Sequence, residues 1–106
     1  MAAQVRSVVW SEDASEALDD AIAYLWPTSQ RASQDLLKRA LQAAESLSTL
    51  SDRGRVVPEL SDSTIREIFV QRYRLLYRVE EHQVIVIAFL HGARDFAAWR
   101  QTQDTV

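Results

Sequence analysis

The sequence predicts a two-layer α+β domain, in which a hairpin of two helices packs on one face of a small, mostly antiparallel sheet. Three observations lead to this fold class. A strand pattern opens the chain, two helical stripes of apolar residues follow it, and three strand patterns joined by short links come last. The order of elements is therefore β-α-α-β-β-β, and the length of 106 residues indicates one domain over residues 1–106.

The first element is a short strand from Val5 to Trp10, which is rich in β-branched and aromatic residues. The connection from this strand through both helices is long enough for a right-handed crossover. We therefore expect the first strand to lie parallel to one of the later strands.

The first helix begins at Ser11 or Asp13, where Asp13 and Glu16, three residues later, resemble a capping box. The helix stops at Pro27, because the residue before a proline is disfavoured in a helix. Its apolar residues recur at helical spacing: Ala14, Ala17, Leu18, Ala21, Ile22 and Leu25.

The second helix begins at Thr28 or Ser29, so close to the first that the two must form an antiparallel hairpin. Ser51 to Thr64 then has the composition of a loop, with Asp, Gly, Pro and Ser in close succession. The apolar residues of the second helix make one stripe that we expect to be buried: Leu36, Leu37, Ala40, Leu41, Ala44, Leu47 and Leu50.

Three strands follow, at Ile65–Val70, Tyr73–Val79 and Val84–Leu90, and their links are short enough for hairpins. The last strand is apolar on both faces, so we expect it inside the sheet. Residues 95–100 are predicted to add a helical turn, and residues 101–106 to form a frayed tail. Side chains of the middle strand alternate, with one face formed by Tyr73, Leu75, Tyr77 and Val79 and the other by Arg74, Leu76 and Arg78.

Composition excludes several classes of protein. The chain has no cysteine, which rules out disulfides and zinc–thiolate sites. Its longest apolar run is the seven residues Val84 to Leu90, and the N-terminus lacks the apolar stretch of a signal peptide. The net charge of −3 argues against broad nucleic-acid binding. We expect a cytoplasmic protein with no membrane partner, no metal and no cofactor.

Arginine dominates the basic residues, since the only lysine is Lys38. Arginine supplies planar, bidentate hydrogen bonds to carboxylates and phosphates. In a meander the start of one strand meets the end of the next, so Arg74 and Arg94 should converge, and Arg66 could join them. The set therefore predicts a site for an anionic partner, formed by Arg55, Arg66, Arg74 and Arg94. Alternatively, these arginines pair locally with Glu59, Glu67 or Asp95.

Two further residues are candidates for function. His91, at the end of the last strand, is either a general acid or base or a residue that hydrogen-bonds to the backbone. Trp99, near the C-terminus, is either an anchor for a partner or a cap on the core.

Several short segments follow one another in a specific order: Gly54-Arg55, Pro58-Glu59-Leu60, Ile65-Arg66-Glu67, Tyr73-Arg74-Leu75-Leu76-Tyr77, and His91 with Arg94-Asp95. In this order and within this length, the chain resembles the RelE/ParE superfamily, the toxins of type II toxin–antitoxin pairs. The resemblance runs from Val8 to Asp95 and implies a RelE/ParE-like toxin fold.

That superfamily divides by target. RelE-like members are ribosome-dependent ribonucleases that cleave mRNA, whereas ParE-like members inhibit DNA gyrase and are not nucleases. The ribonuclease hypothesis makes Glu59, Arg74, His91 and Arg94 the catalytic candidates. The chain departs from the nuclease pattern, because the lysines of those enzymes are missing and the segment after the last strand has no tyrosine.

The resemblance therefore favours a ParE-like inhibitor of DNA gyrase, with a RelE-like ribonuclease and a non-toxic interaction domain as alternatives. It implies a ParD-like antitoxin that lays its C-terminal tail over the groove between the helical hairpin and the sheet. The implied complex holds two toxins and two antitoxins, or more. The residues predicted to contact partners are Arg55, Arg66, Arg74, Arg94, Trp99 and Arg100.

Overall fold

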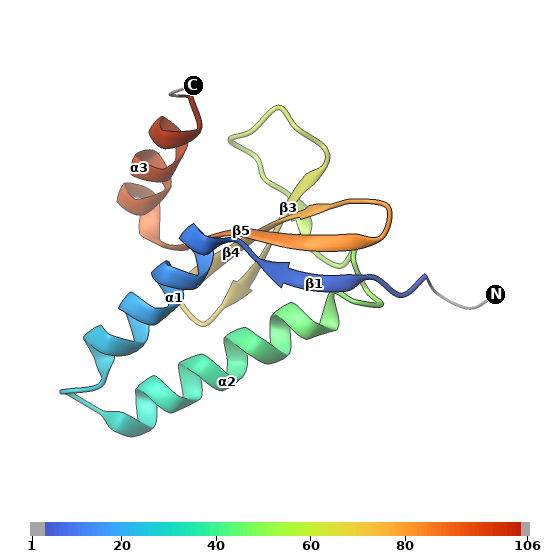
Figure 1. Cartoon of the computed structure of the whole chain (residues 1–106). Coiled ribbons are helices and arrows are strands. Elements are labelled where there is room, and N and C mark those ends of the chain that lie inside the picture. The colour runs from blue at the N-terminus through green and yellow to red at the C-terminus, as the bar shows by residue number, and fades with distance from the viewer. Residues whose placement is uncertain (1–3, 105–106) are drawn as a thin grey trace.

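The computed structural model describes residues 4–104, except for the side chain of Asp104 (Figure 1). The first strand and the helical hairpin come in the predicted order. A second, two-residue strand lies in the segment predicted to be loop, because it pairs with the strand that follows. The elements are β1 (Ser7–Trp10), α1 (Glu12–Leu25), α2 (Gln30–Ser46), β2 (Arg55–Val56), β3 (Ile65–Val70), β4 (Tyr73–Val79), β5 (Gln83–His91) and α3 (Gly92–Asp104).

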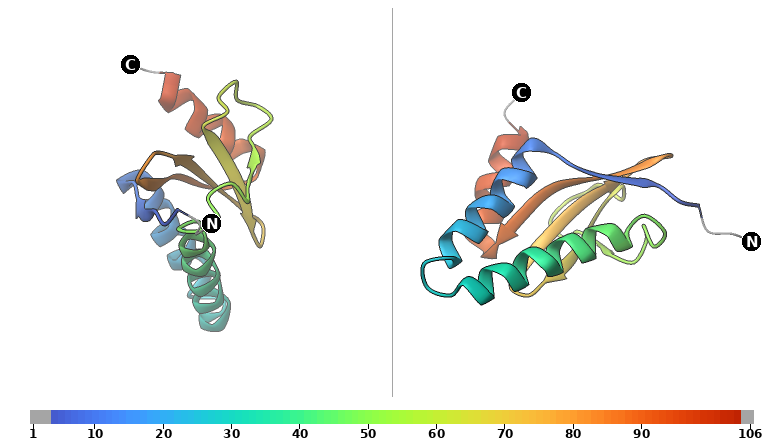
Figure 2. Two further views of the ribbon diagram at one scale, coloured as in Figure 1. Left: turned by 90° about the vertical axis from the view of Figure 1, so that its right-hand side faces the viewer. Right: turned by 60° about the horizontal axis from the view of Figure 1, so that its bottom comes forward.

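The five strands form one sheet in the order β1-β5-β4-β3-β2. β1 runs parallel to β5, with Val8 opposite Val84, and the other neighbours are antiparallel. The parallel first strand and the interior position of β5 are both confirmed. The α1–α2 hairpin packs on one face of the sheet and α3 lies on the other (Figure 2).

The caps of the two long helices are serines. Ser11 Oγ accepts a hydrogen bond from the backbone N–H of Ala14 at 3.1 Å, and Ser29 Oγ accepts one from Ala32 at the same distance. Asp13 lies inside α1 as its second residue, so the predicted Asp13–Glu16 capping box is wrong. The carboxylate of Asp13 instead adds negative charge to the first turn, where the helix dipole favours it.

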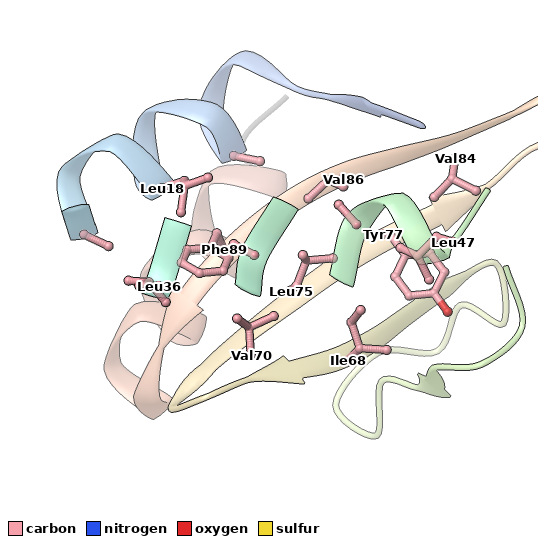
Figure 3. Packing of buried hydrophobic residues seen from close by; sticks show 14 residues of the cluster. Leu18, Leu36, Leu47, Ile68, Val70, Leu75, Tyr77, Val84, Val86 and Phe89 are labelled. Carbon is pink, nitrogen blue, oxygen red and sulfur yellow. The ribbon is translucent and has the colours of Figure 1, made fainter. Parts of the chain in front are cut away.

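The main core lies between the hairpin and the sheet, where Leu36, Leu75 and Tyr77 are fully buried (Figure 3). The predicted stripe on α2 is too wide. Leu37 and Leu41 are 38% and 48% exposed, because each follows a buried residue by one position and so points about 100° away from it around the helix. Leu50, predicted to be buried with them, lies beyond the end of α2 and is also exposed.

A second apolar cluster lies on the opposite face of the sheet, where Phe96 of α3 packs with Leu76 and Leu90. α3 has thirteen residues, which is longer than the single predicted turn. It includes residues 101–104, which were predicted to be a frayed tail; residues 105–106 of that tail lie outside the described residues. No helix within residues 4–104 combines the length and the apolar character needed to cross a membrane.

A β-bulge in β5 decides which side chains reach each face. Leu76 pairs with Ala88 while Tyr77 pairs with Val86, so Ile87 is the extra residue between them. The bulge shifts the alternation by one residue, which turns Phe89 toward the helices and Leu90 toward α3. Strict alternation from Val84 would have placed both the other way round.

Candidate functional site

A buried carboxylate lies at the centre of the arginine cluster. The side chain of Glu67 is fully buried, and each of its oxygens accepts a hydrogen bond from a different arginine. Arg55 Nε donates to Oε2 at 2.6 Å, and Arg74 Nε donates to Oε1 at 2.5 Å. A buried carboxylate stays charged only when it is paired and hydrogen-bonded in this way.

Arg74 connects this carboxylate to the loop before β3. Its two terminal nitrogens each donate to one oxygen of Glu59, both at 2.9 Å, in the bidentate geometry that favours arginine over lysine. The guanidinium also lies 4.6 Å from the ring centre of Phe96, which holds α3 against the sheet. We call Arg55, Glu59, Glu67 and Arg74 the arginine–glutamate network.

Strand register explains why these residues meet. Arg55 of β2 lies directly opposite Glu67 of β3, and Arg74 of β4 lies opposite Phe69, two residues further along β3. Residues two apart on a strand share a face, so Arg74 reaches Glu67 diagonally across the sheet. The local pairing that the sequence offered as an alternative is therefore the arrangement found for Arg55 and Arg74.

The charged groups of the arginine–glutamate network are paired with one another. Hydrogen bonds from Arg74 lower the pKa of Glu59 below its usual value of 4.5, which makes this carboxylate a weaker base. The two carboxylates raise the pKa of Arg74, so its guanidinium stays charged. All three guanidinium nitrogens of Arg74 already donate to carboxylates, which leaves little capacity to bind a further anion.

The other predicted arginines lie apart from this network. Arg66 Nη1 donates to the backbone carbonyl of Gly54 at 2.7 Å. Arg94 and Arg100 are exposed on α3, and neither forms an ion pair with any other residue in the described range 4–104. Arg94 precedes Phe96 by two positions and so points away from the sheet. The predicted convergence of Arg74 and Arg94 is therefore wrong.

His91 lies on the other face of the sheet. Its ring centre is 4.8 Å from that of Tyr73, its partner in the β4–β5 ladder, on the side of the helices. The backbone N–H of His91 donates to Asp95 Oδ2 at 3.0 Å, in line with the strand-end alternative. Trp99 is half-buried against Phe96, with ring centres 5.8 Å apart, and so serves as a cap on the second core.

A cleft opens beside His91, between the helical hairpin and the sheet. It has a volume of about 780 Å³, and its walls come from α1, the start of α2, the β3–β4 turn and the ends of β4 and β5. Tyr73 and Phe89 stack in it with ring centres 4.7 Å apart, and Tyr24 of α1 lies at its side with 81% of its surface exposed. We call this the aromatic cleft, defined by Tyr24, Tyr73, Phe89 and His91.

Only some of these features could be predicted from the sequence. The tyrosines on one face of β4 could be recognised, but the bulge at Ile87 that brings Phe89 beside Tyr73 has no clear pattern. Glu67 was visible only as one of three possible arginine partners. In the part of the chain that the structure describes, no group of three or more His, Asp or Glu side chains is placed to hold a metal ion.

A known protein family and a solved structure resemble this chain. The model of one protein family, described as the ParE toxin of the type II toxin–antitoxin system parDE, matches residues 8–96. A solved structure of a chromosomal ParDE toxin–antitoxin system from P. aeruginosa superposes with a TM-score of 0.68. The match covers 81% of this chain and 95% of that chain at 12% identity, so it shows a shared fold. No curated protein sequence matches the chain significantly.

Proposed function

This chain belongs to the ParE toxin family of type II toxin–antitoxin systems, and on that premise we propose that it inhibits DNA gyrase. We further propose that a ParD-like antitoxin neutralises it, and that both act in the cytoplasm. As the family implies, the neutralised form would be a complex of two toxins and two antitoxins or larger.

The choice of gyrase as the target rests on one observation: the residues that a ribonuclease would need lie apart from one another. Glu59 and Arg74 are bonded to each other on the α3 face of the sheet. His91 lies on the helix face, and Arg94 points into solvent from α3. A ribonuclease must bring a base, an acid and cationic groups to one phosphate. These four residues do not surround one point, which supports a mechanism that binds a protein target.

The aromatic cleft is the surface that best fits the antitoxin. Its floor is the stacked pair Tyr73 and Phe89, and its volume of about 780 Å³ is large enough for several apolar side chains of a docked helix. Tyr24 is exposed at its side and has no buried role in the free chain. An aromatic residue placed this way is typical of a contact that becomes buried when a helix docks in a groove.

Replacing Tyr24 with Ala tests the docking surface. The variant should remain toxic and folded but should need more antitoxin for neutralisation, because about 1–2 kcal/mol of burial is lost. Leu50→Ala is the matched control, since Leu50 is 54% exposed and does not line the aromatic cleft. Neutralisation of the Tyr24 variant at the wild-type antitoxin dose would place the antitoxin elsewhere.

Induction of the chain alone in a bacterium tests the target. We expect plasmid supercoiling by gyrase to be blocked while ribosome-bound mRNA in the same lysates stays intact. Cleaved mRNA with normal supercoiling would instead favour the ribonuclease alternative and would return Glu59, Arg74, His91 and Arg94 to the list of catalytic candidates.

A further inference from the structure

The arginine–glutamate network has an inner and an outer side, which differ in their exposure to solvent. On the inner side, Arg55 and Arg74 both use Nε to bind Glu67, whose side chain is fully buried. On the outer side, the terminal nitrogens of Arg74 bind Glu59, whose side chain is 42% exposed. The inner contacts hold both guanidinium groups in place, whereas the outer contact is open to competition from solvent and solutes.

Each guanidinium group also lies against an aromatic ring. The guanidinium carbon of Arg74 is 4.6 Å from the ring centre of Phe96, and that of Arg55 is 5.4 Å from the ring centre of Phe69. Glu67 and Phe69 lie two residues apart on β3, and the two arginines lie opposite them on the neighbouring strands. These side chains therefore share the α3 face of the sheet, where the two cationic groups are preorganised around one buried carboxylate.

The loop that carries Glu59 is anchored by its neighbours. Val57 is fully buried and Leu60 is half-buried, and both belong to the second apolar cluster. The backbone N–H of Leu60 donates to the carbonyl of Val57 at 3.1 Å. Because these contacts do not involve the carboxylate, a change of side-chain rotamer at Glu59 is enough to free the terminal nitrogens of Arg74.

Charge in the network is balanced only while Glu59 is in place, since two arginines then face two glutamates. The pKa of Glu59 is lowered mainly by the hydrogen bonds from Arg74 and further by the charge of Arg55. Arg55 is therefore close enough to act on any anion at this position. When the carboxylate of Glu59 turns away, the two guanidinium groups are left with one positive charge in excess.

A phosphate group fits this position better than a second carboxylate. Both oxygens of Glu59 accept hydrogen bonds from Arg74, which leaves the terminal nitrogens of Arg55 unmatched. A tetrahedral phosphate can bind Arg74 in the same bidentate way and still present another oxygen to Arg55. The side chain of Arg55 is 57% exposed, so it has the freedom to make this contact.

We propose that Arg55 and Arg74 form a gated phosphate-binding site, which the carboxylate of Glu59 occupies in the free chain and leaves when a phosphate-bearing ligand binds. Glu67 positions both arginines from beneath, and Arg74 keeps its contact with Phe96 during the exchange. The site involves no covalent chemistry and does not depend on the target of the chain, so it goes beyond the proposed function.

The test is a calorimetric titration of inorganic phosphate into the purified chain, in chloride buffer at a constant ionic strength of about 0.1 M. Glu59→Ala should bind phosphate about tenfold more tightly than the wild type, or better, because the wild type must first displace its own carboxylate. The matched control is Glu45→Ala, which removes one exposed acid of α2 and changes the net charge equally. Its affinity should stay within about twofold of the wild type.

A second variant tests the role of Arg55. Arg55→Lys, combined with Glu59→Ala, keeps a cation beside Glu67 but loses the guanidinium fork, and should weaken phosphate binding about fivefold or more. A thermal melt shows whether each variant is folded under the conditions of the titration. Equal phosphate affinity in wild type, Glu45→Ala and Glu59→Ala would overturn the proposal, and so would acetate binding to Glu59→Ala as tightly as phosphate.

The source of the phosphate is distinguished with thymidine and thymidine 5′-monophosphate as further ligands. Phe69 is 60% exposed beside Arg55 and offers a ring on which a base can stack. Tighter binding of the nucleotide than of inorganic phosphate to Glu59→Ala would uphold the site and assign it to a nucleotide, whereas equal binding would uphold it for phosphate alone. Binding of thymidine as tight as that of its monophosphate would contradict the proposal. Because the titration needs neither gyrase nor an antitoxin, its failure is separate from failure of the proposed function.

Discussion

Arg74 and Glu67 form an ion pair across two neighbouring strands, with Nε of Arg74 2.5 Å from Oε1 of Glu67. Glu67 is fully buried and also binds Arg55, while Arg74 continues to Glu59 and to the ring of Phe96. These side-chain contacts therefore link β2, β3, β4, the loop before β3 and α3. We interpret it as a structural clamp that sets the position of α3.

The first prediction concerns the buried carboxylate. Glu67→Ala leaves two arginines without their shared partner, and breaking a buried pair costs about 3–5 kcal/mol in the free energy of unfolding. Urea denaturation followed by circular dichroism measures this change. Glu81→Ala is the control, because its side chain is 84% exposed and its carboxylate lies 3.7 Å from Nε2 of the equally exposed His82. Equal stability of the two variants would show that the clamp is unimportant.

The second prediction concerns a hydrogen bond under β2. The backbone N–H of Gly54 donates to the hydroxyl of Tyr77 at 2.9 Å, and Tyr77 is fully buried. Tyr77→Phe leaves that N–H unsatisfied and should lower the unfolding free energy by about 1–3 kcal/mol. Tyr24→Phe removes an identical hydroxyl from an exposed side chain and should leave the urea midpoint unchanged. A similar shift in both variants would contradict the assignment.

The third prediction is a pH dependence. In the folded protein the pKa of Glu59 lies below its usual 4.5, because Arg74 donates hydrogen bonds to the ionised carboxylate. The stabilising effect is complete above the unfolded pKa and is lost as the pH falls through the folded pKa. Between about pH 5 and pH 3, wild-type stability should therefore fall more steeply than that of Glu59→Gln. Parallel stability profiles would argue against this coupling.

The fourth prediction separates two leucines of α2, one buried and one exposed. Leu36 is fully buried, so Leu36→Ala should cost about 2–5 kcal/mol through lost burial and a cavity. Leu41 is 48% exposed, so Leu41→Ala should cost less than about 1 kcal/mol. Thermal melts of the two variants make the comparison. Similar losses at both positions would mean that α2 is rotated relative to the described packing.

Sequence periodicity was sufficient for the order of the first strand, the two long helices and the three later strands, and for the alternating faces of β4, because these follow from patterns of period 3.6 and 2. The parallel direction of β1 followed from the length of the connection through both helices. Periodicity failed where a single residue changes the geometry. The bulge at Ile87 reverses which of the following side chains of β5 face the helices. The two-residue strand β2 forms because it pairs with β3, and its own composition does not predict it.

The candidate site was less predictable for the same reason. The residues Arg55 and Arg74 were identified, but their closed pairing depends on a diagonal register that composition does not specify. The predicted position of Arg94 was wrong because the chain leaves β5 and enters α3 at Gly92, whose φ of 82° is incompatible with a continuing strand. The aromatic cleft is lined by residues of α1, α2 and the β3–β4 turn, so no single local motif specifies its shape.

The most direct test of the proposed function is a cleavage assay with purified DNA gyrase, a relaxed plasmid, ATP and the purified chain. If the chain is a ParE-like toxin, supercoiling should fall and linear plasmid, released after protein digestion, should increase with its concentration. Unchanged supercoiling at every concentration, together with cutting of mRNA in a parallel translation reaction, would contradict the account.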